Sequence, residues 1–235
     1  MTAAARLAKV EGDLELISRE VRRAISLAAM YSRCTEFHDI VDMMSESMEG
    51  WGFLTVRDAL HRDLIVTLMG VVERGQDRTA CLGVLLKMLG DPQVIEEVKR
   101  GPSRHPEAAA LIAAARCDYE DLHVETMLKS LRTLRDRVIA HVERGEVKHG
   151  VRLGDERQIL LKVIPIVEKI AKALRGEEYH LTELREEWAS NADVFWSHVD
   201  DRKSGATLVI PRGGRIRAGR RRCPGDGARP SGRAW

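Results

Sequence analysis

The chain has 235 residues, of which 44% are hydrophobic and 31% charged, a composition typical of a soluble globular protein with a sizeable core. Charged side chains from Arg6 onward argue against a signal peptide, and the most apolar stretch, 64–72, is about half a membrane span, so we expect a cytoplasmic protein without a membrane contact. The net charge of +2 is uneven: from Arg202 onward there are ten Lys or Arg and one acid, which leaves the preceding body at about −7.

The first predicted element is one long amphipathic helix near the N-terminus. Apolar side chains recur there at alternating spacings of three and four, which places them on one face of a helix. This stripe consists of Leu7, Val10, Leu14, Ile17, Val21, Ala24 and Ala28. A second, shorter helix is predicted from Thr35, an N-cap candidate, to about Glu49.

The next predicted helices are separated by glycine and proline. An apolar pattern over 53–71, ended by Gly75, predicts a long helix. A short apolar helix is predicted over 79–89, and Gly90-Asp91-Pro92 closes it. Another short helix is predicted over 92–100.

Three longer helices complete the body. One is predicted from Pro106, a residue suited to a first helical turn, to about Glu143. The others are predicted over 155–175, with Pro165 bending the helix, and over 178–200. Because no alternation of strand quality occurs in the body, these patterns predict an all-α fold, an antiparallel helical bundle with additional helices.

The C-terminal segment differs in composition from the rest of the chain. Seven of the nineteen glycines and three of the seven prolines follow Lys203, together with most of the basic surplus. Such a segment buries too little apolar surface to offset the entropy of ordering it. We therefore predict a helical domain over 1–203 and a disordered basic tail over 204–235. The tail could neutralise RNA or DNA phosphates, or it could be an extension without function.

Familiar metal and catalytic motifs are missing from the sequence. It contains no Gly-rich phosphate loop, no His-Glu-x-x-His and no Gly-x-Ser-x-Gly. A single Glu-x-x-His unit, Glu120–His123, is read as a solvated helix face. The cysteines lie too far apart for a disulfide framework or a zinc site, and all but the last are expected to be small buried residues; they are Cys34, Cys81, Cys117 and Cys223. No metal or cofactor is expected.

One segment stands out, Leu131-Arg-Thr-Leu-Arg-Asp-Arg-Val-Ile-Ala-His141. The spacing of Arg135 and His141 alone is uninformative, because similar Arg/His pairs occur elsewhere in the chain. Its context is more specific: Asp136 follows the arginine, an apolar run over 138–140 precedes the histidine, and a long predicted helix leads into it. This segment resembles the signature of the HEPN superfamily, and its residue pattern, Leu-Arg-Asp-x-x-x-Ala-His, resembles the abortive-infection (AbiU-like) branch in particular. A weaker resemblance extends over about 10–200.

The resemblance implies a metal-independent endoribonuclease of the toxin or phage-defence type. His141 would be the proton-transfer residue, because an imidazole titrates near neutral pH. Arg135 would stabilise the phosphate with its planar fork, and Asp136 would orient the histidine or the arginine, or hold a ribose hydroxyl. Six helical positions rotate a side chain by about 600°, so Arg135 and His141 of one protomer diverge by about 120°. The resemblance implies a homodimer in which two motifs meet, and a nucleotidyltransferase-like antitoxin partner.

Simpler interpretations remain open. Arg132 and Asp136 are four residues apart and could pair on a solvated helix face. Arg137 and His141 are also four residues apart, and a histidine near a helix C-terminus is favoured by the helix dipole. A non-catalytic HEPN-like interaction or nucleotide-binding module fits the acidic body, and an unrelated helical scaffold is a third possibility. The aromatic residues near the end of the body are favoured as core or as a partner interface; they are Trp188, Phe195 and Trp196. We expect Arg74 and Asp77 to stabilise the packing of the bundle. Five other histidines are expected to be surface or structural residues; these are His61, His123, His149, His180 and His198.

Overall fold

The computed structural model describes residues 2–36, 50–73, 75, 80–100, 106–136, 154–176 and 178–200. Within these ranges the protein is all-α, with eight helices and no strand, which confirms the predicted fold class. The helices are α1 (Ala3–Glu36), α3 (Gly50–Val72), α4 (Leu82–Leu89), α5 (Pro92–Arg100), α6 (Ala108–Val124), α7 (Thr126–Leu134), α8 (Asp155–Arg175) and α9 (Leu181–Asp200). None of these helices is both long and apolar enough to cross a bilayer. The predicted tail, 204–235, lies outside the described residues.

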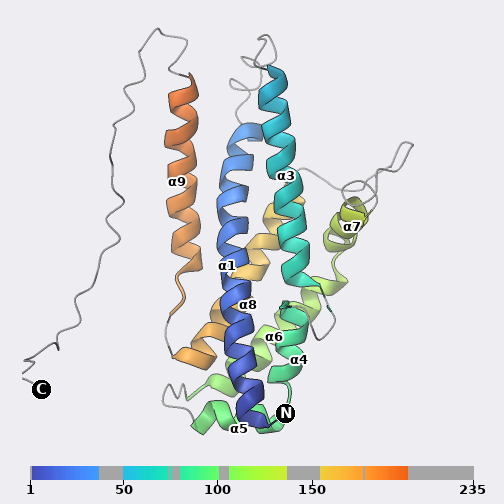
Figure 1. Cartoon of the computed structure of the whole chain (residues 1–235), viewed down its shortest axis with the longest axis vertical. Coiled ribbons are helices and arrows are strands. Elements are labelled where there is room, and N and C mark those ends of the chain that lie inside the picture. Colours follow the sequence, from blue (N-terminus) through green and yellow to red (C-terminus); the bar gives the residue numbers. More distant parts are fainter. Residues whose placement is uncertain are drawn as a thin grey trace, which may run out of the picture. The chain divides into compact units, whose positions relative to one another are not determined.

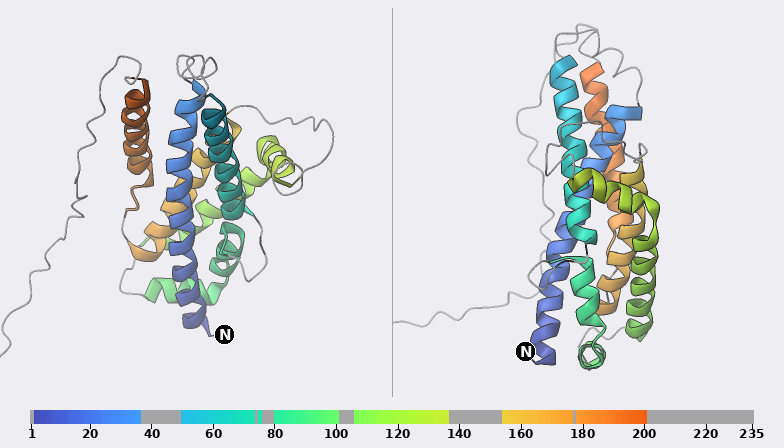
Figure 2. Two further views of the ribbon diagram at one scale, coloured as in Figure 1. Left: turned by 45° about the horizontal axis from the view of Figure 1, so that its top comes forward. Right: turned by 90° about the vertical axis from the view of Figure 1, so that its right-hand side faces the viewer.

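The bundle is organised around α1. Helix α3 runs antiparallel to α1 on one side, and α9 lies along its other side (Figure 1). Helices α6 and α8 form a second antiparallel pair, and α8 also packs on α1. The short helix α5 crosses the end of the bundle near the N-terminus, and one view of Figure 2 looks along its axis. The helices therefore form an antiparallel bundle with α5 and α7 as additions.

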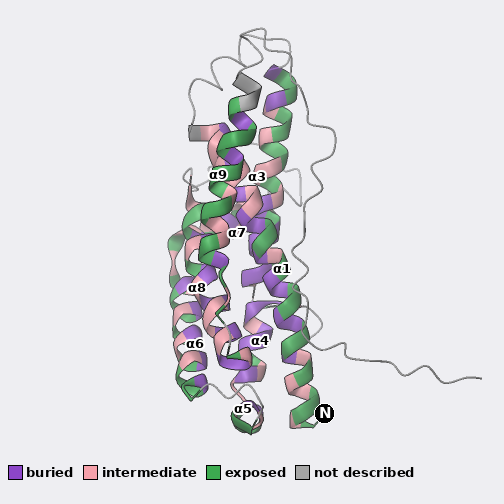
Figure 3. Ribbon diagram, turned by 90° about the vertical axis from the view of Figure 1, so that its left-hand side faces the viewer, coloured by how far each residue is buried: buried purple, intermediate pink, exposed green. Residues whose placement is uncertain are grey.

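The core consists of the inward faces of these helices, whereas their outer faces are exposed (Figure 3). Six of the seven residues in the stripe predicted on the first helix are buried, with Val10, Leu14 and Val21 wholly inaccessible, and Leu7 is half-buried. Full burial of one such side chain contributes about 1.5–3 kcal/mol. Helix α8 spans the predicted range and continues through Pro165. Gly176 ends it with a left-handed φ of 68°.

The C-terminal half of α9 packs against α1 and α3 through a second, small cluster. Cys34 of α1, Phe53 of α3, and Ala192 and Trp196 of α9 are buried together there. The Phe53 and Trp196 rings meet edge to face, with centroids 5.8 Å apart and planes at 84°. This cluster lies apart from the main core, so the C-terminal half of α9 depends on a few side chains.

The helix predicted to begin at Thr35 does not begin there. Thr35 lies inside the last turn of α1, and its hydroxyl is 3.2 Å from the Tyr31 carbonyl and 3.0 Å from that of Ser32. A threonine hydroxyl can bond backward in this way within a helix as well as cap a helix start. The rest of that predicted helix, 37–49, lies outside the described residues.

The single helix predicted from Pro106 to Glu143 is wrong. Helix α6 ends at Val124, Glu125 is extended with ψ 138°, and α7 begins at Thr126. The buried positions of α6 end at Leu122, and those of α7 begin at Leu128. Six positions rotate a side chain by about 120°, so a continuous helix would turn the apolar side chains of α7 away from the core. The break at Glu125 returns them to it.

Candidate active site

Arg135 lies where α7 ends. It follows Leu134 as the C-cap residue, with helical dihedral angles of φ −57° and ψ −51°. Residues 135 and 136 continue the chain as a wider, π-type turn. Such turns occur often at functional sites, because they change the direction of the following side chains. The candidate motif therefore begins at a change in helical winding.

Two carboxylates hold the Arg135 guanidinium. Its Nη1 pairs with Glu73, just beyond the end of α3, while its Nε donates to Asp136 Oδ1 at 2.7 Å and its Nη2 lies 2.6 Å from the same oxygen. Burial lowers the pKa of Arg135, but the bonds to Glu73 and Asp136 outweigh burial and hold that pKa above its ordinary value. The guanidinium therefore stays charged. Asp136 pairs with Arg135, not with Arg132 as the helix-face interpretation proposed, among the described residues.

The end of α3 is itself fixed by α6. The Tyr119 hydroxyl lies 3.1 Å from the Val72 carbonyl and 3.3 Å from that of Glu73, and His123 Nε2 lies 3.0 Å from the Val72 carbonyl. The last carbonyls of a helix have no partner within it, so these side chains satisfy acceptors that the helix leaves open. This arrangement sets the backbone of Glu73 and, through its carboxylate, the position of Arg135.

The site can be compared directly with the sequence predictions. The structure brings Arg135 and Asp136 together and adds Glu73 and Tyr119, which sequence reasoning missed. His123, read from the sequence as part of a solvated face, bonds to the end of α3. The sequence did contain one signal for this contact: Tyr119 and His123 are four residues apart, and that spacing places both side chains on the same face of a helix. The third predicted residue, His141, lies outside the described residues, as do Arg74 and Asp77.

Chemically, the described part of the site is an anchored cation. Contacts with described residues occupy three of the five N–H donors of Arg135, and none of these residues accepts from the other two. A guanidinium of this kind can stabilise charge developing on a phosphate oxygen. No group of three or more His, Cys, Asp or Glu side chains suited to a metal occurs within the described ranges.

A second polar cluster lies between α1, α3 and α8. Glu156, in the first turn of α8, is only 3% exposed, and its Oε2 lies 3.9 Å from His61 Nε2, too far for a hydrogen bond. The His61 ring stacks on Tyr31, with centroids 4.6 Å apart. Burial raises the pKa of Glu156, lowers that of His61 and raises that of Tyr31 to about 12. All three shifts favour the neutral forms, as expected for polar groups inside a core.

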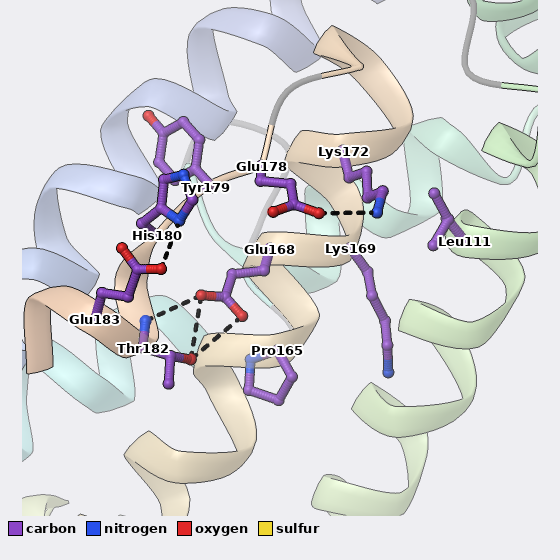
Figure 4. A pocket seen from close by; sticks show the side chains of 10 residues that line it. All are labelled: Leu111, Pro165, Glu168, Lys169, Lys172, Glu178, Tyr179, His180, Thr182 and Glu183. Atoms are coloured by element: carbon purple, nitrogen blue, oxygen red, sulfur yellow. Dashed lines mark hydrogen bonds and ion pairs between the residues drawn. The ribbon is translucent and has the colours of Figure 1, made fainter.

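A hollow of about 400 Å³ lies beside the connection from α8 to α9 (Figure 4). Its polar groups hold that connection in place. Glu168 of α8 accepts the Thr182 backbone N–H at 3.0 Å and so caps the start of α9, while Lys172 lies 3.4 Å from Glu178. His180 Nδ1 lies 3.1 Å from Glu183. We therefore assign these residues to the turn, not to a ligand site.

The remaining candidates have structural positions. Trp196 is buried and Trp188 packs partly buried on the main core, whereas Phe195 is 53% exposed. Cys34 and Cys81 are buried as predicted, but Cys117 is exposed, which corrects the expectation of a buried cysteine there. Cys117 lies on the outer face of α6, whose inward face consists of other residues, Ile112, Ala115, Tyr119 and Leu122.

Comparison with known proteins adds one finding. A family model described as AbiU2, of the HEPN type, matches residues 8–195. The matched range runs from the first turns of α1 to most of α9 and includes both Arg135 and His141. No curated protein and no solved structure matches the chain.

Proposed function

The chain belongs to the AbiU2 family of the HEPN superfamily, and from this premise we propose that it is a metal-independent endoribonuclease of the abortive-infection type. Its catalytic residues would be Arg135, Asp136 and His141. The observation that carries the proposal is the position of Arg135 at a change in helical winding, where the Glu73 and Asp136 carboxylates pair with two edges of its guanidinium group.

The proposed reaction uses the nucleophile that RNA itself carries. One imidazole removes the proton from a ribose 2′-hydroxyl, and the 2′-oxygen attacks the adjacent phosphorus. The bond from phosphorus to the 5′-oxygen breaks, and that oxygen takes a proton from a second imidazole. The products are a 2′,3′-cyclic phosphate and a 5′-hydroxyl. Arg135 would stabilise the charge on the phosphate oxygens throughout.

This scheme favours a homodimer. One chain supplies a single His141, whereas the reaction needs one group to take a proton and another to give one. A two-fold contact brings the same residues of both subunits to one place, so two copies of His141 could share the task. A nucleotidyltransferase-like antitoxin partner remains part of the proposal through the family alone.

The experiment compares wild type with His141→Ala and Arg135→Ala on a defined single-stranded RNA. Denaturing gels report cleavage, and sensitivity of the 3′ ends to a cyclic phosphodiesterase reports their chemistry. We expect loss of His141 to reduce cleavage by about 10²–10⁴-fold and the loss of Arg135 to reduce it without altering the fold, which circular dichroism checks. Arg132→Ala, in the last turn of α7, is the matched control. Equal cleavage by all four proteins, or none by wild type with and without divalent ions, would refute the proposal.

A non-catalytic interaction or nucleotide-binding module is the second candidate. Two observations favour it: the body before Arg202 has a charge of about −7, and Arg135 is neutralised by two acids in the structure. A long RNA prefers a positive groove. This candidate predicts that purified wild type leaves RNA intact while still forming a dimer.

A further inference from the structure

Helix α7 is a short helix with Arg135 at its C-terminal end. It has nine residues, and its buried side chains are Leu128 and Leu131. It leaves the line of α6 at Glu125 and turns toward α3 (Figure 2). A helix of this length is not stable by itself in water. Its contacts with α3, α6 and α8 therefore decide where the guanidinium of Arg135 lies.

The start of α7 is held by an ion pair with α8. Glu125, the extended residue between α6 and α7, pairs with Lys162 through its Oε1. Its other oxygen, Oε2, is inaccessible to solvent and has no hydrogen-bond partner within the described ranges. A carboxylate placed in this way has lost part of its hydration, so it depends on a nearby cation for compensation. Loss of Lys162 would remove that compensation at the residue where the chain changes direction.

A second ion pair of the same kind joins α8 to α6. Lys169 of α8 pairs with Asp118 of α6. Seven helical positions return a side chain to within about 20° of the same direction, so Lys162 and Lys169 lie on one face of α8. Their side chains are 46% and 33% exposed. The two pairs differ in what they fix, because Asp118 lies inside α6, whereas Glu125 leads into α7.

We infer that Lys162 is a positioning residue for the proposed reaction: through Glu125 it sets the direction of α7, and so the place of the Arg135 guanidinium relative to the phosphate under attack. The inference rests on the proposed ribonuclease function. Glu73 holds Arg135 at the other end of α7, so an ion pair fixes each end of this short helix. Charge stabilisation at a phosphate requires accurate placement of the cation, and a small displacement by a remote change reduces the rate strongly.

The test compares cleavage of a defined single-stranded RNA by full-length wild type, Lys162→Ala and the matched control Lys169→Ala. Each variant removes one lysine–carboxylate pair from the same face of α8, so both should lower thermal stability by similar, small amounts. We expect the kcat of Lys162→Ala to fall by about 10–10²-fold with KM nearly unchanged, because only the alignment in the transition state is lost. Lys169→Ala should keep kcat within about twofold of wild type, because its ion pair does not involve α7.

Two further variants separate positioning from a general loss of stability. Lys162→Arg keeps a cation opposite Glu125 and should retain kcat within about threefold of wild type. The double variant Glu125→Gln/Lys162→Ala should cleave no more slowly than Lys162→Ala alone, because both residues act through one pair. Equal kcat in Lys162→Ala and Lys169→Ala, or a loss that Lys162→Arg does not reverse, overturns the inference.

Hydrogen exchange distinguishes failure of this inference from failure of the proposed function. Amides of α7 should exchange about five- to tenfold faster in Lys162→Ala than in Lys169→Ala, the loss of one partly buried ion pair. Faster exchange in α7 alone, together with a wild type that cleaves nothing, disproves the nuclease and keeps Lys162 as the residue that fixes α7. Equal exchange of α7 in the two variants overturns the role of Lys162 whether or not wild type cleaves RNA.

Discussion

Replacing Trp196 by alanine should release the C-terminal half of α9 while leaving the main core folded. Trp196 is 5% exposed and packs edge to face on Phe53 in the small cluster with Cys34 and Ala192. Its indole N–H has no hydrogen-bond partner among the described residues, so its contribution is packing. Truncation of a buried aromatic residue to alanine costs about 3–5 kcal/mol. Because the cluster is separate from the main core, we expect this cost to fall on α9.

Hydrogen exchange detected by mass spectrometry measures the effect. A loss of about 3–5 kcal/mol raises the exchange rate of the affected amides by roughly 10²–10⁴-fold. Peptides from the second half of α9 should show this increase, while peptides from α8 should remain protected. The control is Phe195→Ala, a neighbouring aromatic residue that is 53% exposed and should cost less than about 1 kcal/mol. Unchanged protection in α9, or a parallel loss in every helix, would contradict the reasoning.

Three further predictions concern stability and reactivity. Burial raises the pKa of Glu156, so the stability that the wild-type carboxyl contributes is present below its unfolded pKa and is lost as the pH rises through the folded value. The Glu156→Gln variant should therefore become more stable than wild type as the pH is raised above about 4.5, which urea unfolding measures. A stability difference that does not vary with pH would disprove this prediction. Glu168→Ala removes the acceptor for a backbone N–H in the first turn of α9 and should cost about 0.5–2 kcal/mol, measured by thermal unfolding against wild type. In a Cys223→Ser background a thiol reagent should label exposed Cys117 rapidly and Cys34 slowly, because burial raises the pKa of Cys34 to about 12; equal rates in the native protein would show that Cys34 is accessible.

Helix positions could be predicted where a long apolar stripe coincided with clear termini. The helix predicted over 155–175 is found at Asp155–Arg175, and the one predicted over 92–100 at Pro92–Arg100. In the first case the stripe is strong and a glycine ends the helix; in the second Pro92 starts it. These signals are local, so the sequence carries them without knowledge of the fold.

Features that depend on tertiary contacts could not be predicted from local sequence patterns. The break at Glu125 arises because the buried faces of α6 and α7 are out of register, and a change of register within a continuous apolar pattern resembles one long helix. The partner of Arg135 could not be predicted either, because Glu73 lies 62 residues away and no local spacing connects the two. The motif resemblance singled out Arg135 and Asp136 as candidates but did not indicate which side chains contact them.

The two candidate functions differ in what happens to the anions around Arg135. The guanidinium is charged and already bound to Glu73 and Asp136. Asp136 is 51% exposed on its side chain, whereas Glu73 follows the end of α3, which α6 fixes. Substrate could therefore displace Asp136 more readily than Glu73. Such an exchange replaces one anion by another, so the charge on Arg135 stays compensated and its burial adds little cost. The displaced Asp136 would then be free to accept a hydrogen bond from the ribose, so the compensation seen in the structure does not exclude catalysis.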